Sequence, residues 1–157
     1  VAKTLVAMTA LVRAIGERSV QRRYMALCQG ELVERAFSIE APIGRDPQSR
    51  VRMAVVASGK PARTDVERAA RRDGFSAVFC TLHTGRTHQI RVHLASRGHP
   101  LVADSLYGGV PALGMTRQAL HALRLGFQHP TSGQALQFDC PPPPDLAFAW
   151  QQVTRKR

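Results

Sequence analysis

The segment 83–109 holds the densest group of chemically capable side chains in this sequence. Four of them fall within eight residues: Arg86, His88, Arg91 and His93. Guanidinium groups form paired hydrogen bonds with phosphates and base edges, and histidine exchanges protons near neutral pH. On a helix that begins near Thr87, His88 and Arg91 would share one face. The amino terminus of that helix, beside Arg86, would attract phosphate and is a first candidate for a binding site.

Metal binding and cysteine chemistry fit the same region less well. The spacings of 5, 5 and 6 residues between His83, His88, His93 and His99 place them on different faces of a helix, and no H-E-x-x-H motif occurs. We therefore predict no metal site. Cys80 beside a histidine could serve as a nucleophile, but it lies in an apolar run, where cysteine is usually a small core residue. The sequence contains neither a P-loop nor a glycine-rich dinucleotide loop.

The chain is strongly basic. Its 157 residues include 22 Lys and Arg against 11 Asp and Glu, a formal net charge of +11. Such a charge attracts polyanions, so nucleic acid is the expected partner and an anionic membrane surface is the rival. Only Lys3, Lys60 and Lys156 are lysines, and arginine suits bidentate phosphate contacts better than lysine does. The other explanation of the charge is a solvated basic surface that aids solubility.

Cysteine usage and hydropathy indicate a cytoplasmic protein. Cys28, Cys80 and Cys140 are far apart and odd in number, which argues against a disulfide framework. No window approaches the roughly 20 apolar residues of a membrane span. The apolar opening 1–15 lacks the order of charges of a secretory signal. We expect a reducing compartment and no membrane contact, and the sequence implies no protein partner.

The pattern of apolar residues predicts an α+β domain with a largely antiparallel sheet. Alternation over 20–28 predicts a strand with Met25 and Leu27 on one face and Tyr24 on the other. Thr84 or Thr87 is the expected cap of the central helix. Strands mostly follow one another through turns, which favours antiparallel neighbours. The predicted helices span 5–18, 87–97 and 145–152, and the predicted strands span 20–28, 51–57, 75–82, 120–130 and 135–141.

Several blocks resemble, in order, the RluA family of pseudouridine synthases. TGRTHQIRVHL (84–94) and GHPLVADSLYGG (98–109) are similar to the signature region of that family. IGRDPQSRVRMAV (43–55) most resembles the RluD branch, which acts on large-subunit ribosomal RNA. The remaining similar blocks are VAKT (1–4), RRYMAL (22–27), SGKPART (58–64) and RQALHALRLGFQHPTSG (117–133). The resemblance covers almost the whole chain.

The resemblance implies a fold, a reaction and roles for five residues. The expected fold is the pseudouridine synthase catalytic fold, a mixed but mostly antiparallel sheet flanked by helices and loops. Arg91 corresponds to the arginine that pairs with the catalytic aspartate. Tyr24 corresponds to the tyrosine that stacks on the target uracil and takes part in late proton removal. Arg86, His88 and Lys60 are expected RNA contacts, and the family reaction needs neither a metal nor a cofactor.

The catalytic aspartate of the family is not found among these 157 residues. It belongs to an H-R-L-D block that precedes the segment matching VAKT, and no such block occurs here. Asp104 matches a structural aspartate of the family. Because the first residue is Val1, we expect residues 1–157 to be the C-terminal part of a single catalytic domain that binds RNA without turnover. The alternative is a non-catalytic RNA-binding or ribosome-assembly remnant of the same fold.

Overall fold

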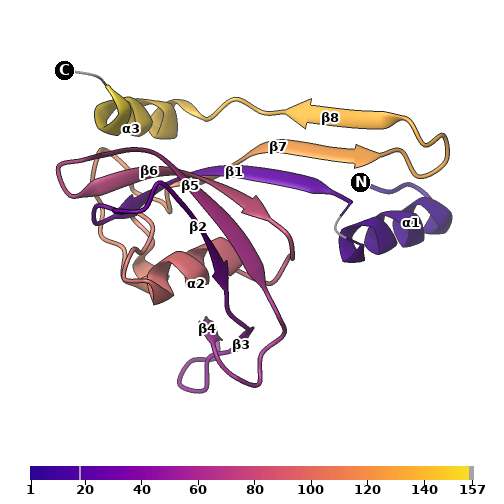
Figure 1. The fold of residues 1–157 in the computed structure, drawn as a ribbon, viewed down its shortest axis with the longest axis horizontal. Helices are drawn as coiled ribbons and strands as arrows, with labels where there is room; N and C mark the ends of the chain where they lie inside the picture. The colour runs from indigo at the N-terminus through magenta and orange to yellow at the C-terminus, as the bar shows by residue number, and fades with distance from the viewer. Residues whose placement is uncertain (18, 156–157) are drawn as a thin grey trace.

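The computed structural model describes residues 1–17 and 19–155 as one six-stranded sheet, a two-stranded hairpin and three α-helices (Figure 1). The sheet has the order β2-β5-β6-β1-β7-β8, and every pairing within it is antiparallel among the described residues. The expected α+β class is therefore confirmed. The strands are β1 Gln21–Gln29, β2 Ala36–Glu40, β3 Ile43–Arg45, β4 Met53–Val55, β5 Arg63–Arg72, β6 Phe75–Leu82, β7 Leu120–Gln128 and β8 Ala135–Asp139. The helices are α1 Leu5–Gly16, α2 Gln89–Ser96 and α3 Pro144–Thr154, with a 3-10 turn η1 at Ser105–Tyr107.

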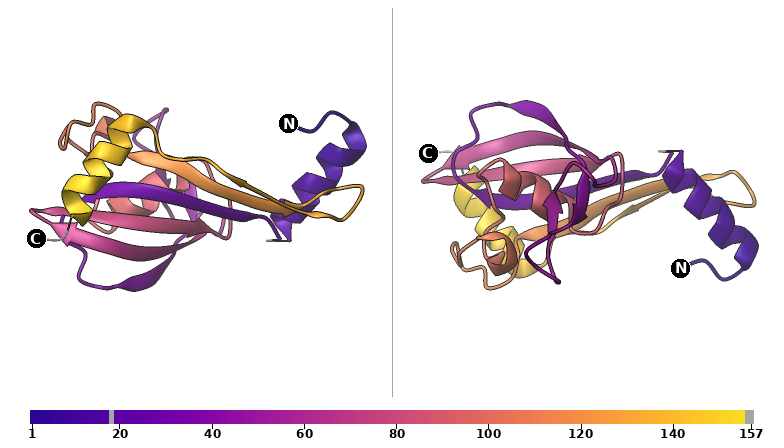
Figure 2. Two further views of the ribbon diagram at one scale, coloured as in Figure 1. Left: turned by 90° about the horizontal axis from the view of Figure 1, so that it is seen from above. Right: turned by 90° about the horizontal axis from the view of Figure 1, so that it is seen from below.

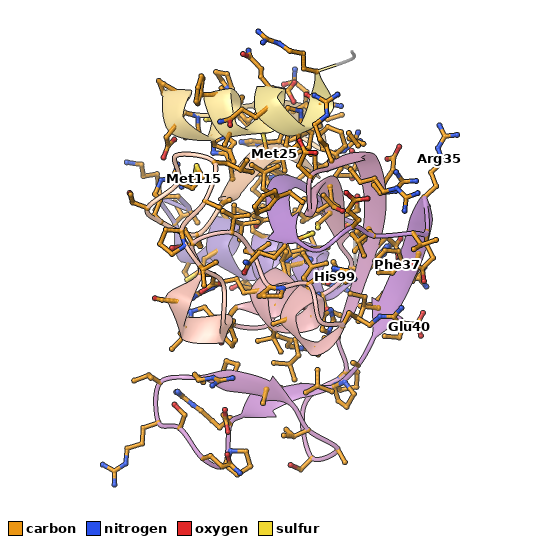
Figure 3. The ribbon with its side chains drawn as sticks, turned by 90° about the vertical axis from the view of Figure 1, so that its left-hand side faces the viewer. Met25, Arg35, Phe37, Glu40, His99 and Met115 are labelled. Carbon is orange, nitrogen blue, oxygen red and sulfur yellow. The ribbon has the colours of Figure 1, made fainter. Side chains whose placement is uncertain are left out.

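Strand β1 separates the two main parts of the core. Met25 and Leu27 pack in a cluster with Leu146 of α3. Ala26 and Cys28 pack in a second cluster with Leu94 of α2. The two helices cover opposite faces of the sheet (Figures 1 and 2), and Met25 lies on the α3 side (Figure 3). The predicted strand over 20–28 and its division into two faces are confirmed, and both faces are buried from Met25 to Cys28.

The long strand β5 was not predicted from the sequence. Its residues, RTDVERAARR, are mostly charged residues and alanines, which favour helices over strands when taken alone. Pairing with β2 on one side and β6 on the other overrides that preference. The turn to β6 has positive φ angles at Asp73 (51°) and Gly74 (82°). These angles are typical of a tight hairpin turn, which the Asp-Gly pair does predict.

Residues 43–55 form a hairpin arm that projects from the body of the domain (Figure 1). The arm contains β3, β4 and the connecting loop, and it carries the exposed residues Arg45, Arg50 and Arg52. Its base is anchored by Ile43, which is buried among Val92 of α2 and Tyr107 of η1. The strand predicted over 51–57 is shorter in the structure because Arg52 and Val56 lie outside the ladder with β3.

Helix α1 lies beside the far end of the β7–β8 hairpin, away from α2 and α3 (Figures 1 and 2). The predicted helical spacing is confirmed, and the side chain of Thr4 accepts a hydrogen bond from the amide of Ala7 as an N-cap. None of the α1 residues is buried within the described part of the chain. Its stability therefore depends on local factors, namely the cap and the Arg13–Glu17 ion pair.

The carboxylate of Asp65, on β5 between β2 and β6, links stability to pH. Burial alone would raise the pKa of Asp65, but hydrogen bonds from Ser38, His83 and Arg63 lower it to about 2. A carboxyl group whose pKa is lower in the folded state stabilises the protein above its unfolded pKa. That stability is lost as the pH falls from about 4 toward 2.

We therefore expect Asp65→Asn to lower the free energy of unfolding at pH 7 by about 1 kcal/mol, a value reduced for the partial exposure of the group. Urea unfolding curves at pH 7 and pH 2.5 would measure the difference between the variant and the parent. The two proteins should converge at the lower pH. An equal difference at both pH values would contradict this assignment.

Candidate functional site

The loop before α2 is held in place by the buried side chain of Gln89. Its Oε1 accepts hydrogen bonds from the Thr84 hydroxyl (2.8 Å) and the Arg86 amide (3.0 Å). Its Nε2 donates to the backbone oxygen of Arg63 (2.9 Å) on β5. The loop that presents Arg86 is thereby fixed to the sheet. The Arg86 amide is already engaged, so any phosphate contact at this point would come from its side chain.

Helix α2 begins two residues later than predicted. The sequence predicted a start at Thr87 with a threonine cap, but the first helical residue is Gln89. His88 is the N-cap residue, has a left-handed backbone (φ 56°) and makes no side-chain cap. The predicted threonine cap is wrong because the Thr84 hydroxyl donates to Gln89 and accepts from the Arg63 amide.

Arg91 on α2 forms a buried ion pair with Asp104. Its Nε and Nη2 donate to the two carboxylate oxygens, each at 2.7 Å. The side chain of Asp104 is 1% exposed and that of Arg91 is 14% exposed. The hydrogen bond to Asp104 raises the pKa of Arg91 above its ordinary value, although burial opposes the shift. Within the described chain, Nη1 of Arg91 donates to no acceptor, so the guanidinium can still bind a second anion.

Tyr107 of η1 lies beside this ion pair. Its ring is 4.8 Å from Cζ of Arg91 and 5.6 Å from Cζ of Arg52 on the arm. Its hydroxyl accepts from the Met53 amide (3.1 Å) and lies 2.8 Å from Nδ1 of His88. Burial and the charge of Arg91 lower the pKa of His88, so the imidazole is neutral at pH 7 and its Nδ1 can accept the hydroxyl hydrogen.

Tyr24 is half-buried on the α2 side of β1. It packs against the cluster that contains Leu94 and Ile90 of α2, and Ile90 directly precedes Arg91 in the sequence. No hydrogen bond or cation–π contact joins Tyr24 to Arg91 among the described residues. The structure therefore places the two predicted catalytic residues on adjacent elements on the same side of the sheet, not in direct contact.

Arg22 is a neighbour of this region that the sequence reasoning missed. One guanidinium nitrogen lies so close to Gly85 that a Cβ there would be 2.6 Å from it. Another donates weakly to the backbone oxygen of Leu82 (3.5 Å), and Nε is buried without a partner among the described residues. The signal was available, because Arg22 stands two residues before Tyr24 on the same face of a predicted strand.

A basic pocket of about 420 Å³ separates the arm from the loop before α2. Lys60 and Arg86 line it, as does Arg45, which was not predicted as a site residue. Nε of Arg86 donates to the backbone oxygen of Pro61 (3.1 Å). Gly59 permits the close approach of the two segments, because a Cβ there would lie 2.5 Å from the backbone of Ile43. His88 does not line this pocket and contacts Tyr107 instead.

The remaining candidates for chemistry are structural residues. Cys80 is a buried core residue, and burial raises the pKa of its thiol. Burial likewise raises the pKa of Cys28 to about 12, so both thiols stay protonated. Across the described residues, no group of three or more His, Cys, Asp and Glu side chains could hold a metal ion. None of the described helices is long and apolar enough to cross a membrane.

Proteins of one family match most of this chain. Residues 1–96 match the family described as RNA pseudouridylate synthase. Ribosomal large subunit pseudouridine synthase D of Nitrosomonas europaea is 45% identical over 161 residues, which cover 98% of this chain and 46% of that protein. The synthase D of Neisseria meningitidis serogroup B is 48% identical, over 93% of this chain and 42% of that protein. This chain thus spans somewhat under half the length of these relatives.

A solved structure gives the same result. Human RNA Pseudouridylate Synthase Domain Containing 1 superposes with a TM-score of 0.78 and 33% identity, over 95% of this chain and 66% of that one. The sequence blocks around Tyr24 and Arg91, the antiparallel sheet and the relatives all agree. The chain therefore belongs to the RNA pseudouridylate synthase family and is of the RluA/RluD type.

Proposed function

We propose that this chain is the C-terminal part of a catalytic domain that isomerises uridine to pseudouridine in large-subunit ribosomal RNA. The observation that carries the proposal is the similarity of more than nine-tenths of the chain to two proteins named as ribosomal large subunit pseudouridine synthases. The buried Arg91–Asp104 pair supports it, as does the basic pocket, whose lining residue Met53 donates a hydrogen bond to Tyr107 beside that pair. We also propose a cytoplasmic location, with which the free cysteines Cys28, Cys80 and Cys140 agree.

The reaction exchanges one bond to the ribose for another. The N-glycosidic bond breaks, the uracil turns, and C5 bonds to the ribose. The hydrogen on C5 is released as a proton, and N1, which no longer bonds to the ribose, takes up a proton, so that the product is an isomer of the substrate. The target nucleotide must leave its stack to reach such a site. We assign to Arg91 the role of keeping a catalytic carboxylate ionised and oriented, because its Nη1 can donate while Asp104 holds Nε and Nη2. No step of this reaction requires a metal or a cofactor.

Tyr24 is the proposed stacking partner of the target base. Its aromatic face can stack on uracil, and its hydroxyl can receive or release a proton late in the reaction. Its place on β1 is rigid because both neighbouring strands, β6 and β7, pair with it through that residue. Rigid support suits a residue that must hold a base in one orientation.

The proposed RNA contacts are Lys60, Arg86 and His88. Lys60 and Arg86 come from separate loops and line one pocket, where their charges would bind a backbone phosphate. Such contacts displace counterions, so the affinity should fall steeply with salt. The lowered pKa of His88 leaves its imidazole neutral at pH 7, so it would contact RNA by hydrogen bonding and not by charge. Its Nδ1 lies at hydrogen-bond distance from the Tyr107 hydroxyl.

The chain by itself is proposed to bind RNA without isomerising it, because its 157 residues contain no H-R-L-D block. Release of tritium from RNA that carries [5-³H]uridine would measure turnover, since the C5 hydrogen leaves only when the new bond forms. We expect RNA binding with no release above background. A family segment that carries H-R-L-D, supplied as a second polypeptide, should restore release, and the same segment with asparagine in place of the aspartate should not. Release by the 157 residues alone would overturn the proposal.

The RNA contacts can be tested with single substitutions. Arg86→Gln and Lys60→Gln are each expected to weaken binding to a ribosomal RNA fragment by about fivefold and to reduce the salt slope by about one counterion. Fluorescence anisotropy at several salt concentrations measures both. The matched control is Arg35→Gln, because Arg35 is exposed and points away from the body of the domain, at a place remote from the arm (Figure 3). An equal effect of the control would show that only net charge matters.

A further inference from the structure

The hydroxyl of Tyr107 joins two parts of the molecule that are far apart in sequence. It accepts a hydrogen bond from the Met53 amide on the arm at 3.1 Å. It also lies 2.8 Å from Nδ1 of His88, at the start of α2, and we assign its hydrogen to that nitrogen. Since Tyr107 is 7% exposed, water has little access to replace these bonds.

The ring of Tyr107 faces the ion pair of the site. Cζ of Arg91 lies 4.8 Å from the ring centre, a distance at which a guanidinium is attracted to an aromatic face. The backbone of Tyr107 is fixed to the same loop, because its amide donates to the carbonyl of Asp104 at 3.0 Å. Tyr107 therefore moves with the Arg91–Asp104 pair.

The arm contributes two arginines, Arg45 and Arg52, to the surroundings of the site. Arg45 lines the basic pocket together with Lys60 and Arg86, and Arg52 lies 5.6 Å from the Tyr107 ring. The arm is narrow, with only three paired residues in each of its two strands. A hairpin of this size is marginal by itself and takes its position from what it contacts.

We propose that Tyr107 is a positioning residue that holds the arm at a fixed distance from the Arg91–Asp104 pair, so that RNA bound by the arm is presented correctly to Arg91. This inference rests on the proposed function and deepens it. It adds a residue to the site and explains why the left-handed His88 is held where its Nδ1 meets the hydroxyl. Tyr107 would act on RNA through the arm and not by touching the reacting atoms.

We call the hydrogen bonds of the Tyr107 hydroxyl with Met53 and His88 the Tyr107 latch. Hydrogen exchange, followed amide by amide by NMR, tests this latch without RNA. Tyr107→Phe removes the hydroxyl and keeps the ring. We expect the Met53 amide to exchange about tenfold faster, the effect of losing one buried hydrogen bond. The Val56 amide is the internal control, because it donates to the carbonyl of Pro42 at the base of the arm and should be unchanged. Equal acceleration at Met53 and Val56 would mean general loosening and would overturn the proposal.

RNA binding then tests the consequence through a double-mutant cycle. Arg45→Gln should weaken the binding of a ribosomal RNA fragment by about fivefold in the parent and by less than twofold in Tyr107→Phe, because a released arm no longer places Arg45 on the RNA. Arg35→Gln should have the same small effect in both backgrounds. A purely structural role for Tyr107 would lower the melting temperature and leave the effect of Arg45→Gln unchanged, which would overturn the proposal.

The outcomes separate this inference from the proposed function. If the parent chain binds no RNA, the proposed function fails and the positioning role fails with it. If the parent binds RNA but Arg45→Gln weakens RNA binding equally with and without the Tyr107 hydroxyl, only the role of Tyr107 fails. Binding by the parent, together with selective exchange at Met53 and a cost of Arg45→Gln that depends on the hydroxyl, supports both.

Discussion

Asp104→Ala is expected to lower the free energy of unfolding by about 3–5 kcal/mol, the largest effect that we predict for a charged residue of this chain. The carboxylate is 1% exposed and receives two hydrogen bonds of 2.7 Å from Arg91. Its removal leaves a guanidinium that is mostly buried and without its counter-ion. Such a charge loses the attraction of its partner and cannot fully regain the hydration that folding removed.

Urea unfolding at pH 7 measures this effect, and an exposed ion pair supplies the control. Glu34 lies 3.5 Å from Arg97, and both side chains are about half exposed (53% and 52%). Glu34→Ala should therefore cost less than about 1 kcal/mol. The double variant Arg91→Met with Asp104→Leu should recover much of the loss, because it removes both charges together. Similar costs for Asp104→Ala and Glu34→Ala would show that Asp104 is better solvated than its burial indicates.

The substitution Asp104→Ala also has an expected effect on catalysis. Arg91 is held by Asp104 through Nε and Nη2, so the guanidinium has one orientation in the folded protein. In Asp104→Ala that orientation is lost even in the molecules that remain folded. Restoration of tritium release by the H-R-L-D segment should then fail, although the arm and its RNA contacts are intact.

Gly109→Ala is expected to destabilise the protein by about 3–4 kcal/mol and to lower the melting temperature by about 10 °C. A Cβ on Gly109 would overlap the carbonyl oxygen of Leu101 and lie 2.8 Å from the amide nitrogen of Asp104. Both obstacles are backbone atoms, which cannot rotate away as a side chain can. The backbone around Asp104 must therefore shift, and Asp104 is the partner of Arg91.

Thermal unfolding measures this effect, and Gly16→Ala is the matched control. A Cβ at Gly16, the last residue of α1, would meet no atom within 4 Å. That substitution should be neutral or slightly stabilising, because alanine restricts the unfolded chain more than glycine does. If Gly109→Ala changed stability by less than about 0.5 kcal/mol, the loop would be able to relax around the added carbon. The precise placement of Asp104 would then not depend on glycine at this position.

Local patterns in the sequence were sufficient for most of the elements that surround the site. The extended character of 20–28 predicted β1 and its two faces, and the apolar run after Asp73-Gly74 predicted β6. The strand β5 was missed because its charged and alanine-rich residues take their conformation from two neighbouring strands. The start of α2 was predicted too early because the side chain of Gln89, and not a threonine, accepts the hydrogen bond of a backbone amide in the preceding loop, that of Arg86.

The sequence by itself determined the chemistry that is available to this protein. Its basic charge, the cluster around Arg91 and the block that contains Tyr24 indicated RNA and a member of the RluA family, because residue types and short spacings are local properties. Only the tertiary structure decided which groups meet. Asp104 as the partner of Arg91, the latch at Tyr107 and the pocket shared by Arg45 and Lys60 all join segments 13 to 54 residues apart. Such pairings are set by strand register and core packing, which depend on the whole chain at once.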